Sequence, residues 1–392
     1  MMDALFVINV GSSSVKYGIY DPHGRDADGL KRIDRGNIDL QREHVPTIDA
    51  AIDLLLSRLN GMRVVAVGHR IVHGGMLYHA PIEVDDDVIA HLHSFESLAP
   101  LHQPYNVAAL ESMRAHLPDA LQVACFDTAF HGDQPEVATW FGLNRELYEA
   151  GVRRYGFHGL SYEFVAARLP EVLGPIGRGR VIAAHLGSGA SMCAMVDGKS
   201  VATSMGFTAL DGLMMGTRCG DLDPGVVMHL MFERGMNKRE INSLLYQGSG
   251  LKGVSGISAD MRVLLDSEDT RAAFAVDLFC YRAALMLGQM AMAAGGVDAI
   301  VFTGGIGENS ARIRAMTLDH LKVFGFTLDE AANAACVGGR AGRISTGIGP
   351  VAIVVPTDEE GMIAADAARL AETVPVAIPI GMPAHADARL AL

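Results

Sequence analysis

Hydrophobic and polar positions follow two patterns along this chain, and each pattern predicts a different element. Short apolar runs predict strands at residues 4–10, 14–20, 63–68, 121–126, 180–186, 191–196, 298–303 and 351–355. Apolar positions three and four residues apart predict helices at about 47–59, 104–116, 161–169, 224–233, 238–246, 268–294, 309–321 and 359–372. Because strands and helices alternate, we expect an α/β protein with largely parallel sheets.

Two stretches of the chain share one local plan. Residues 7–20, VINVGSSSVKYGIY, and 181–199, VIAAHLGSGASMCAMVDGK, each place a Gly-Ser turn between an apolar strand and an alternating strand. Such a turn presents backbone N–H groups and hydroxyls to one point, where an anion can bind. An ordinary hairpin explains the first stretch equally well. The repetition favours two similar domains that hold a nucleotide between them.

A third glycine-rich segment strengthens the case for a nucleotide. Residues 299–310, AIVFTGGIGENS, form a predicted strand that ends in glycines, with Asn309 expected to cap the next helix. Glycines let a ligand approach the backbone, and a helix N-terminus favours negative charge. The chain lacks the GxxxxGK[ST] phosphate loop, and this segment does not complete GxGxxG, which argues against those two nucleotide folds.

Composition and charge narrow the class of partner. The 392 residues are 49% hydrophobic, enough for a large core and about two to three domains. A net charge of −13 without a long basic run argues against nucleic acid and anionic membranes as partners. Five widely spaced cysteines, no basic leader and no apolar run long enough to span a bilayer indicate a cytoplasmic protein.

Three charged side chains are candidates for a site that binds an anionic substrate. Arg70 follows the strand at 63–68, and Arg218 lies in a Gly-flanked loop. A structural salt bridge explains either arginine alone, but two facing arginines would clamp a carboxylate and a phosphoryl group. Asp127 ends a predicted strand, where a carboxylate either caps a helix or faces a ligand crevice.

Two further positions have a structural and a chemical interpretation. Asp358 and Glu359 open a predicted helix, where acidic residues are favoured electrostatically but could also hold Mg²⁺ through water. His158 stands between Gly156 and Gly159, which favours an exposed turn over a packed core.

Taken together, the motifs resemble those of the acetate kinase family, within the actin, Hsp70 and sugar-kinase superfamily. The matching segments occur in family order and cover residues 4 to about 372: INVGSSSVKY, GHRIVHGG, LAPLHQPYN, FDTAFH, YGFHG, HLGSGAS, SMGFTALDGLMMGTRCGDLDPG, FTGGIGENS and VVPTDEE.

The resemblance implies a fold and a reaction. The fold is two duplicated actin-like (ribonuclease H-like) α/β domains, with the active site in the cleft between them. We expect an N-terminal domain over 1–150, a C-terminal domain with the nucleotide loops over 151–358, and a helix at about 359–392 that packs back on the first domain. The reaction is reversible, Mg²⁺-dependent phosphoryl transfer from ATP to acetate, giving acetyl phosphate and ADP; Mn²⁺ can substitute, and a homodimer is expected.

The resemblance also assigns roles to individual residues. Arg70 and Arg218 match the arginines that hold the carboxylate and the migrating phosphoryl group. Asp127 matches the acid that helps to organise the arginines and magnesium. His158 matches the histidine that contacts the phosphoryl group in the transition state. Asn9 and Glu359 match residues around magnesium. Val72, His102 and Phe157 match the substrate pocket. The positions that match the family's nucleotide-binding residues are Ser12, Ser14, Lys16, His185, Leu186, Gly187, Ser188, Gly189, Gly304, Gly305, Ile306, Gly307, Glu308 and Asn309.

The chemistry of the acceptor agrees with these roles. A carboxylate is already ionised at neutral pH, so it needs alignment and charge cancellation rather than a general base. We therefore expect direct in-line transfer, without a phosphorylated Glu359. Val72 resembles the residue found in acetate-preferring members of the family, so the resemblance implies acetate over propionate, although one methylene discriminates by only about 1–3 kcal/mol. A propionate or other short-chain carboxylate kinase, a sugar or polyol kinase and a non-enzymatic ATP-driven switch remain alternatives.

The chain departs from the family pattern at five positions. Ser188 replaces the usual Asn of HLGNG. Leu160 and Tyr162 replace the Thr and His that follow YGFHG, and Ala209 and Asp211 replace the Pro and Glu of GFTPLEG. These changes bear on nucleotide contact and substrate preference, and they leave the proposed catalytic residues intact.

Overall fold

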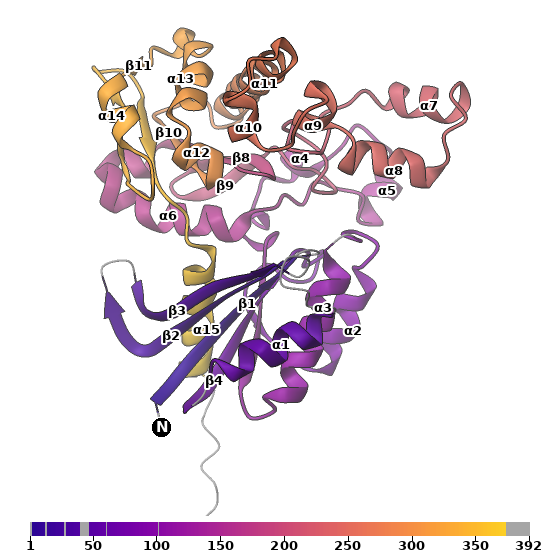
Figure 1. Cartoon of the computed structure of the whole chain (residues 1–392), viewed down its shortest axis with the longest axis vertical. Coiled ribbons are helices and arrows are strands. Elements are labelled where there is room, and N and C mark those ends of the chain that lie inside the picture. Colours follow the sequence, from indigo (N-terminus) through magenta and orange to yellow (C-terminus); the bar gives the residue numbers. More distant parts are fainter. Residues whose placement is uncertain are drawn as a thin grey trace, which may run out of the picture.

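The computed structural model describes residues 2–11, 14–26, 29–39, 47–59, 61–100 and 102–373, which form two lobes (Figure 1). Each lobe is built on a six-stranded sheet. The first sheet has the order β3-β2-β1-β4-β6-β5, with β1 Met2–Val10, β2 Ser14–Asp26, β3 Gly29–Asp39, β4 Met62–Ile71, β5 Ile82–Glu83 and β6 Leu121–Phe126. The second has the order β12-β14-β10-β7-β8-β9, with β7 Arg180–Leu186, β8 Ala190–Val196, β9 Lys199–Thr203, β10 Ala299–Thr303, β12 Gly342–Arg343 and β14 Val351–Val354.

The two sheets repeat one topology. In each, three consecutive antiparallel strands come first: β1, β2 and β3 in one lobe, and β7, β8 and β9 in the other. In the first lobe, β1 also pairs in parallel with β4, and β4 pairs in parallel with β6. In the second lobe, β7 pairs in parallel with β10, and β10 pairs in parallel with β14. The predicted duplicated α/β fold is confirmed.

Helices cover both faces of the first sheet. Helices α1 (Ile48–Ser57) and α3 (Gln103–His116) pack on one face through a shared apolar cluster with β1 and β4. The opposite face is covered by α15 (Glu359–Thr373), whose Ile363, Ala364 and Ala367 lie among Leu5 and Val123 of the sheet (Figure 1). The chain therefore returns from the second lobe to the first before residue 373.

Helix α6 (Gly159–Leu173) lies between the two sheets. Its Leu160 packs into the α15 cluster, whereas Val165 and Leu169 pack against the second sheet. We propose domain boundaries at the predicted positions, 1–150 and 151–358, with α15 assigned to the first domain because its apolar face is buried there.

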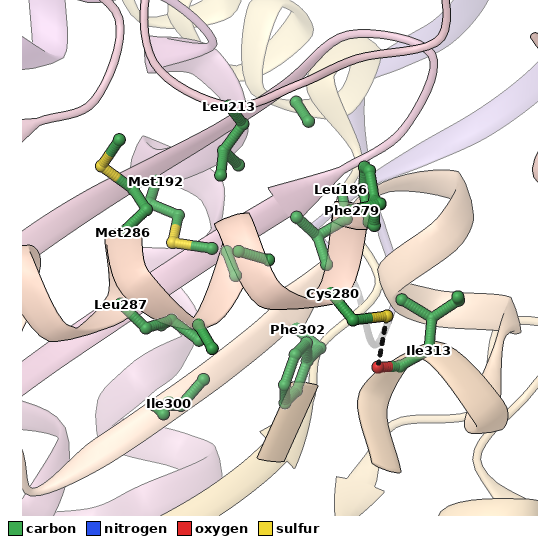
Figure 2. Packing of buried hydrophobic residues seen from close by; sticks show 14 of the residues in the cluster. Leu186, Met192, Leu213, Phe279, Cys280, Met286, Leu287, Ile300, Phe302 and Ile313 are labelled. Atoms are coloured by element: carbon green, nitrogen blue, oxygen red, sulfur yellow. Dashed lines mark hydrogen bonds between the residues drawn. The ribbon is translucent and has the colours of Figure 1, made fainter. Parts of the chain in front are cut away.

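The core of the second lobe lies under the long helix α11 (Thr270–Ala293). Phe279, Met286 and Leu287 of this helix belong to one buried cluster with Ile300 and Phe302 of β10. Figure 2 shows Leu287 beside Ile300 and Met286 beside Met192 of β8. The Cys280 Sγ donates to the backbone carbonyl of Ile313, at 3.9 Å, which joins α11 to α13 (Ala311–Asp319). The other elements are β11 Thr327–Leu328, β13 Ser345–Thr346, α2 Asp86–Ser94, α4 Glu136–Thr139, α5 Arg145–Glu149, α7 Pro224–Phe232, α8 Lys238–Gln247, α9 Gly250–Ser255, α10 Met261–Leu265, α12 Gly304–Asn309, α14 Glu330–Ala335 and the 3-10 turns Ala129–His131, Gly174–Arg178 and Lys322–Phe324.

The structure corrects one local expectation. The segment after β10 was expected to be a loop, but residues 304–309 form the helical turns of α12. Asn309 ends α12, and Ser310 caps α13 by accepting from the backbone N–H of Ile313. The predicted capping role of Asn309 is therefore wrong. No helix within the described residues is both long and apolar enough to cross a bilayer.

Candidate active site

The cleft between the lobes has a volume of about 550 Å³ and is lined from both sheets. Most of the residues singled out in the sequence meet there: Lys16, Arg70, Val72, His102, Asp127, Phe157, His158, His185, Gly187, Ser188, Gly189, Arg218, Gly304, Gly305, Glu308 and Glu359. Residues far apart in the chain converge because β4, β6, β7 and β10 all end at this cleft.

Arg70 and Asp127 form a fixed ion pair at the floor of the cleft. Arg70 lies near the end of β4 and Asp127 directly follows the neighbouring parallel strand β6. Asp127 accepts from Arg70 Nε at 3.1 Å and from Nη2 at 2.6 Å, and Asn9 Oδ1 accepts from Nη1 at 3.2 Å. Burial lowers the pKa of Arg70, but Asp127 and Glu359 raise it more, so the guanidinium stays charged. Burial raises the pKa of Asp127, and Arg70 opposes this shift.

Arg218 is held differently. Its Nη1 donates to the backbone carbonyl of Ala209 at 2.7 Å, and no carboxylate among the described residues pairs with it. Burial lowers its pKa, and Arg70 acts in the same direction, but a guanidinium remains charged at neutral pH. A partly buried cation with no anionic partner among the described residues indicates a place where a ligand supplies the negative charge.

His158 enters the cleft from a strained backbone. It precedes α6 with φ +58°, in the left-handed region that non-glycine residues rarely adopt. The next amide, Gly159 N–H, donates to the Asp127 carbonyl at 2.8 Å, which ties this turn to the end of β6. An added Cβ at Gly189 would lie 3.3 Å from both His158 Nε2 and Arg218 Nη2, so the two side chains converge there.

The imidazole of His158 is partly buried, which corrects the expected exposed turn. Its ring stacks on His185, with centroids 4.3 Å apart. Burial lowers the pKa of His158 well below its usual value, and His185, Arg70 and Arg218 lower it further. Burial and Arg70 lower the pKa of His185 to about 4. Both imidazoles are therefore neutral at pH 7.

Two glycine-rich turns form the wall of the cleft on the second lobe. Residues 187–189 join β7 to β8, and Gly304 and Gly305 begin α12. Gly304 has φ +76°, and a Cβ there would approach the Leu186 carbonyl oxygen to 2.9 Å. Glu308 Oε1 accepts from the backbone N–H groups of Gly304, at 2.8 Å, and Thr357, at 3.1 Å. Through these two hydrogen bonds, the Glu308 carboxylate connects the start of α12 to the segment that leads into α15.

Some of the predicted nucleotide contacts lie away from the lining of the cleft. The Leu186 side chain points into the core (Figure 2), and Ile306 packs against the same cluster. Gly307 is buried, and Asn309 is exposed and accepts from Gly338 N–H at 2.9 Å. Ser14 begins β2. Ser12 falls outside the described residues.

Three apolar residues, Val72, Phe157 and Ala209, line the same cleft as the two arginines, and we call this part of the lining the apolar recess. Val72 and Phe157 are almost fully buried. His102 borders it, and burial, Arg218 and Arg70 lower the pKa of this histidine to about 4. A recess with neutral walls beside two cations fits a short carboxylate with a small alkyl group.

The oxygen donors at the first-lobe end of the cleft fit a weakly held magnesium ion. Glu359 and Glu360 line the cleft with carboxylate oxygens, and the buried Asn9 lies next to them, with Nδ2 3.4 Å from Glu360 Oε1 and Oδ1 accepting from Arg70 Nη1. The described residues contain no cluster of three or more His, Cys, Asp or Glu side chains that would form a complete metal cage. This fits Mg²⁺, which keeps water and shares phosphate oxygens with a nucleotide.

Sequence analysis missed several residues of the site. Thr357 and Glu360 line the cleft next to Glu359. Behind His158, the buried Ser191 and Tyr162 form a hydrogen-bonded chain with it. One signal was available, because Tyr162 follows His158 by four positions and residues so spaced share a helix face.

A duplicated fold whose lobes face one cleft, lined by glycine-rich turns and two arginines, indicates a protein that binds phosphorylated ligands. The acetokinase family model matches residues 4–365. An acetate kinase of Rhodopseudomonas palustris (strain TIE-1) is 50% identical over 398 aligned positions, which cover 95% of this chain and 99% of the relative. An acetate kinase of Rhizobium meliloti is 45% identical over 93% of this chain and 97% of its own.

Solved structures agree with the family. The Porphyromonas gingivalis acetate kinase has a TM-score of 0.82 and 37% identity, over 94% of this chain and 99% of its own. A propionate kinase from Francisella tularensis has a TM-score of 0.83 and 32% identity, over 93% and 99%. The chain belongs to the acetokinase family.

Proposed function

We propose that this protein is an acetate kinase that transfers the terminal phosphoryl group of ATP reversibly to acetate, forming acetyl phosphate and ADP. The observation that carries the proposal is the pair of arginines in one cleft: Arg70 is paired with Asp127, and Arg218 has no anionic partner in the part of the chain that the structure describes. Family membership and the whole-chain identity to acetate kinases support the same reaction.

Each side chain has a distinct task in this reaction. Arg70 and Arg218 hold the carboxylate in the apolar recess and offset the repulsion between two anions that approach each other. Asp127 keeps the Arg70 guanidinium in a fixed orientation. Neutral His158 offers a hydrogen bond from Nε2 to the phosphoryl oxygens as charge develops. The acetate oxygen attacks in line, so no side chain has to remove a proton.

The nucleotide is held by the other lobe. The turns at 187–189 and 304–305 line the cleft, and backbone N–H groups of such turns bind phosphates, although the Gly304 N–H is already bonded to Glu308. Ser188, in place of the usual family Asn, offers a shorter side chain with a hydroxyl instead of an amide for this contact. Asn9 and Glu359 would hold Mg²⁺, which neutralises phosphate charge when it is bound. The five cysteines are free thiols, in keeping with a reducing cytoplasm.

Acyl hydroxamate formation tests the reaction directly. The enzyme is incubated with Mg-ATP, hydroxylamine and acetate, propionate, butyrate, glycerol or glucose. We expect acetate to give the strongest hydroxamate signal and propionate a weaker one, because Val72 and Phe157 bound a small recess. The signal should vanish with EDTA and return with Mg²⁺ or Mn²⁺. No signal from any carboxylate, with ADP formed from glycerol or glucose, would replace this proposal with a sugar or polyol kinase.

We further propose that the protein is a homodimer through the second domain. Helix α7 is apolar in sequence, PGVVMHLMF, yet none of its residues is buried in the monomer. Phe232 is 68% exposed and Met228 51%, and Phe274 of α11 is 61% exposed. A second copy of the chain would cover these side chains, since so many exposed large apolar residues are typical of an interface.

Light scattering after size exclusion tests the dimer. The chain has a mass of 41.7 kDa, and we expect the native protein to elute at twice that mass. Met231→Asp with Phe232→Asp should give a folded monomer, because charges on α7 cannot be buried without cost. Val323→Asp, at an 86% exposed residue of another surface, should leave the dimer intact. A native protein that elutes at 41.7 kDa would contradict the dimer.

A further inference from the structure

Behind His158 lies a short chain of hydrogen bonds that does not reach the cleft. His158 Nδ1 lies 2.8 Å from Ser191 Oγ, and Ser191 Oγ lies 2.5 Å from the Tyr162 hydroxyl. Ser191 and Tyr162 are both completely buried. Ser191 belongs to β8 and Tyr162 to α6, so the chain is fixed by two packed elements.

The available hydrogen atoms determine which group donates in each of these two hydrogen bonds. Burial raises the pKa of Tyr162 well above its usual value, so the phenol keeps its hydrogen. Among the described residues, Ser191 Oγ is the side-chain partner of that hydroxyl. If Ser191 donated to Tyr162, the buried phenol hydrogen would have no acceptor, which is costly. With the phenol donating, Ser191 accepts from Tyr162 and donates its own hydrogen to His158 Nδ1.

The ring nitrogen at the other side of His158 faces the reaction. A Cβ added to Gly189 would lie 3.3 Å from Nε2 and 3.3 Å from Arg218 Nη2, so Nε2 lies at the cleft wall beside the unpaired guanidinium. A neutral imidazole carries one hydrogen, and if Nδ1 accepts, that hydrogen lies on Nε2. The opposite tautomer would present a lone pair to the negatively charged phosphoryl oxygens.

We propose that Tyr162 is a positioning residue, which donates through Ser191 to Nδ1 of His158 and thereby keeps the His158 hydrogen on Nε2, facing the phosphoryl group. This inference rests on the proposed function for its consequence in catalysis, but the tautomer itself does not depend on the substrate. Tyr162 occupies a position where the family usually has His, so the assignment concerns this chain's own residue.

Nitrogen NMR of the full-length protein labelled with ¹⁵N-histidine tests the tautomer without a measurement of activity. The His158 signals are assigned by their loss in His158→Asn. We expect wild-type His158 to have a protonated Nε2 and an unprotonated Nδ1. In Tyr162→Phe the two tautomers should exchange, because Ser191 can then also accept from Nδ1–H. His185, whose Nδ1 lies 2.8 Å from Ser161 Oγ, serves as an internal control and should not change.

Kinetics test the consequence. We expect Tyr162→Phe to lower kcat roughly tenfold, the effect of one lost hydrogen bond, with little change in the KM of acetate. Ser191→Ala should have the same effect, and the double variant should be no slower than Ser191→Ala, because the two residues act through one chain. Tyr148→Phe is the matched control, since it loses a hydroxyl contact of 2.9 Å to Thr139 away from the cleft. It should retain wild-type kcat.

Two results would overturn the inference. One is a protonated Nδ1 on His158 in the wild-type protein. The other is an unchanged Nε2–H tautomer in Tyr162→Phe together with an unchanged kcat. A wild-type protein that forms no acyl phosphate, yet shows the expected tautomer and its loss in Tyr162→Phe, would refute the proposed reaction and retain the role of Tyr162 in fixing His158.

Discussion

Replacing Arg218 by alanine should reduce kcat by about 10²- to 10³-fold, the loss expected when one preorganised donor to a developing charge is removed. Arg218 is partly buried and lines the cleft, and its Nη2 lies near the glycine turn at 189. No carboxylate within the described part of the chain neutralises it, so its full charge is available to the ligand. Steady-state kinetics with acetate and Mg-ATP measure the effect.

The stability of the same variant provides an independent check. Because Arg218 is desolvated without an ion-pair partner, its removal relieves a cost of burial, and we expect Arg218→Ala to melt no lower than the wild type. Arg218→Lys keeps the charge but loses the planar guanidinium with its two parallel donors, so its kcat should lie between those of the wild type and Arg218→Ala. Arg262→Ala, which removes a surface guanidinium bonded to Asp260, should retain wild-type kcat and serves as the control. Full activity in Arg218→Ala would exclude this arginine from the chemistry.

Much of the fold could be predicted because its strands are strongly patterned. Residues 4–10 are all buried, and residues 180–186 are buried except Arg180 and His185; the two runs form β1 and β7, the equivalent strands of the two sheets. Strand β3 (Gly29–Asp39) was missed because its sequence, GLKRIDRGNID, is mostly polar and its only fully buried apolar residue is Ile38. Its place at the edge of the sheet leaves most of its side chains partly or fully exposed to solvent.

The candidate site likewise contains features that the sequence predicted and features that it did not. Arg70, Asp127 and Arg218 lie at strand ends or in glycine-rich loops, where a sequence marks positions near a cleft. The helical form of 304–309 could not be predicted, because glycine is a poor helix former and the turn depends on Glu308 accepting from Gly304 N–H. The link from Tyr162 to Ser191 joins residues on different elements, so only the packed fold reveals it.

Replacing Asp127 by asparagine should have the opposite effect on stability from the loss of Arg218. Asp127 is 1% exposed and holds Arg70 through two hydrogen bonds, and the Arg70 side chain is 20% exposed. Asparagine keeps the shape but leaves a largely buried guanidinium without its counter-charge. Breaking such a pair costs about 3–5 kcal/mol, so we expect a clear decrease in the free energy of unfolding in urea.

Activity should fall in the same variant through the position of Arg70. A misplacement of about 1 Å in a group that orients substrate can cost about 10²-fold, and we expect a kcat loss of that order in Asp127→Asn. Asp3→Asn is the matched control, because Asp3 also bonds an arginine on β4 through two contacts of 2.7 Å, but with Arg63 65% exposed to solvent. Solvent screens that pair, so both stability and kcat should remain at wild-type values. If Asp127→Asn were as stable and as active as Asp3→Asn, the Arg70–Asp127 pair could not be what fixes the guanidinium, and Asn9, which accepts from Arg70 at 3.2 Å, would have to hold it instead.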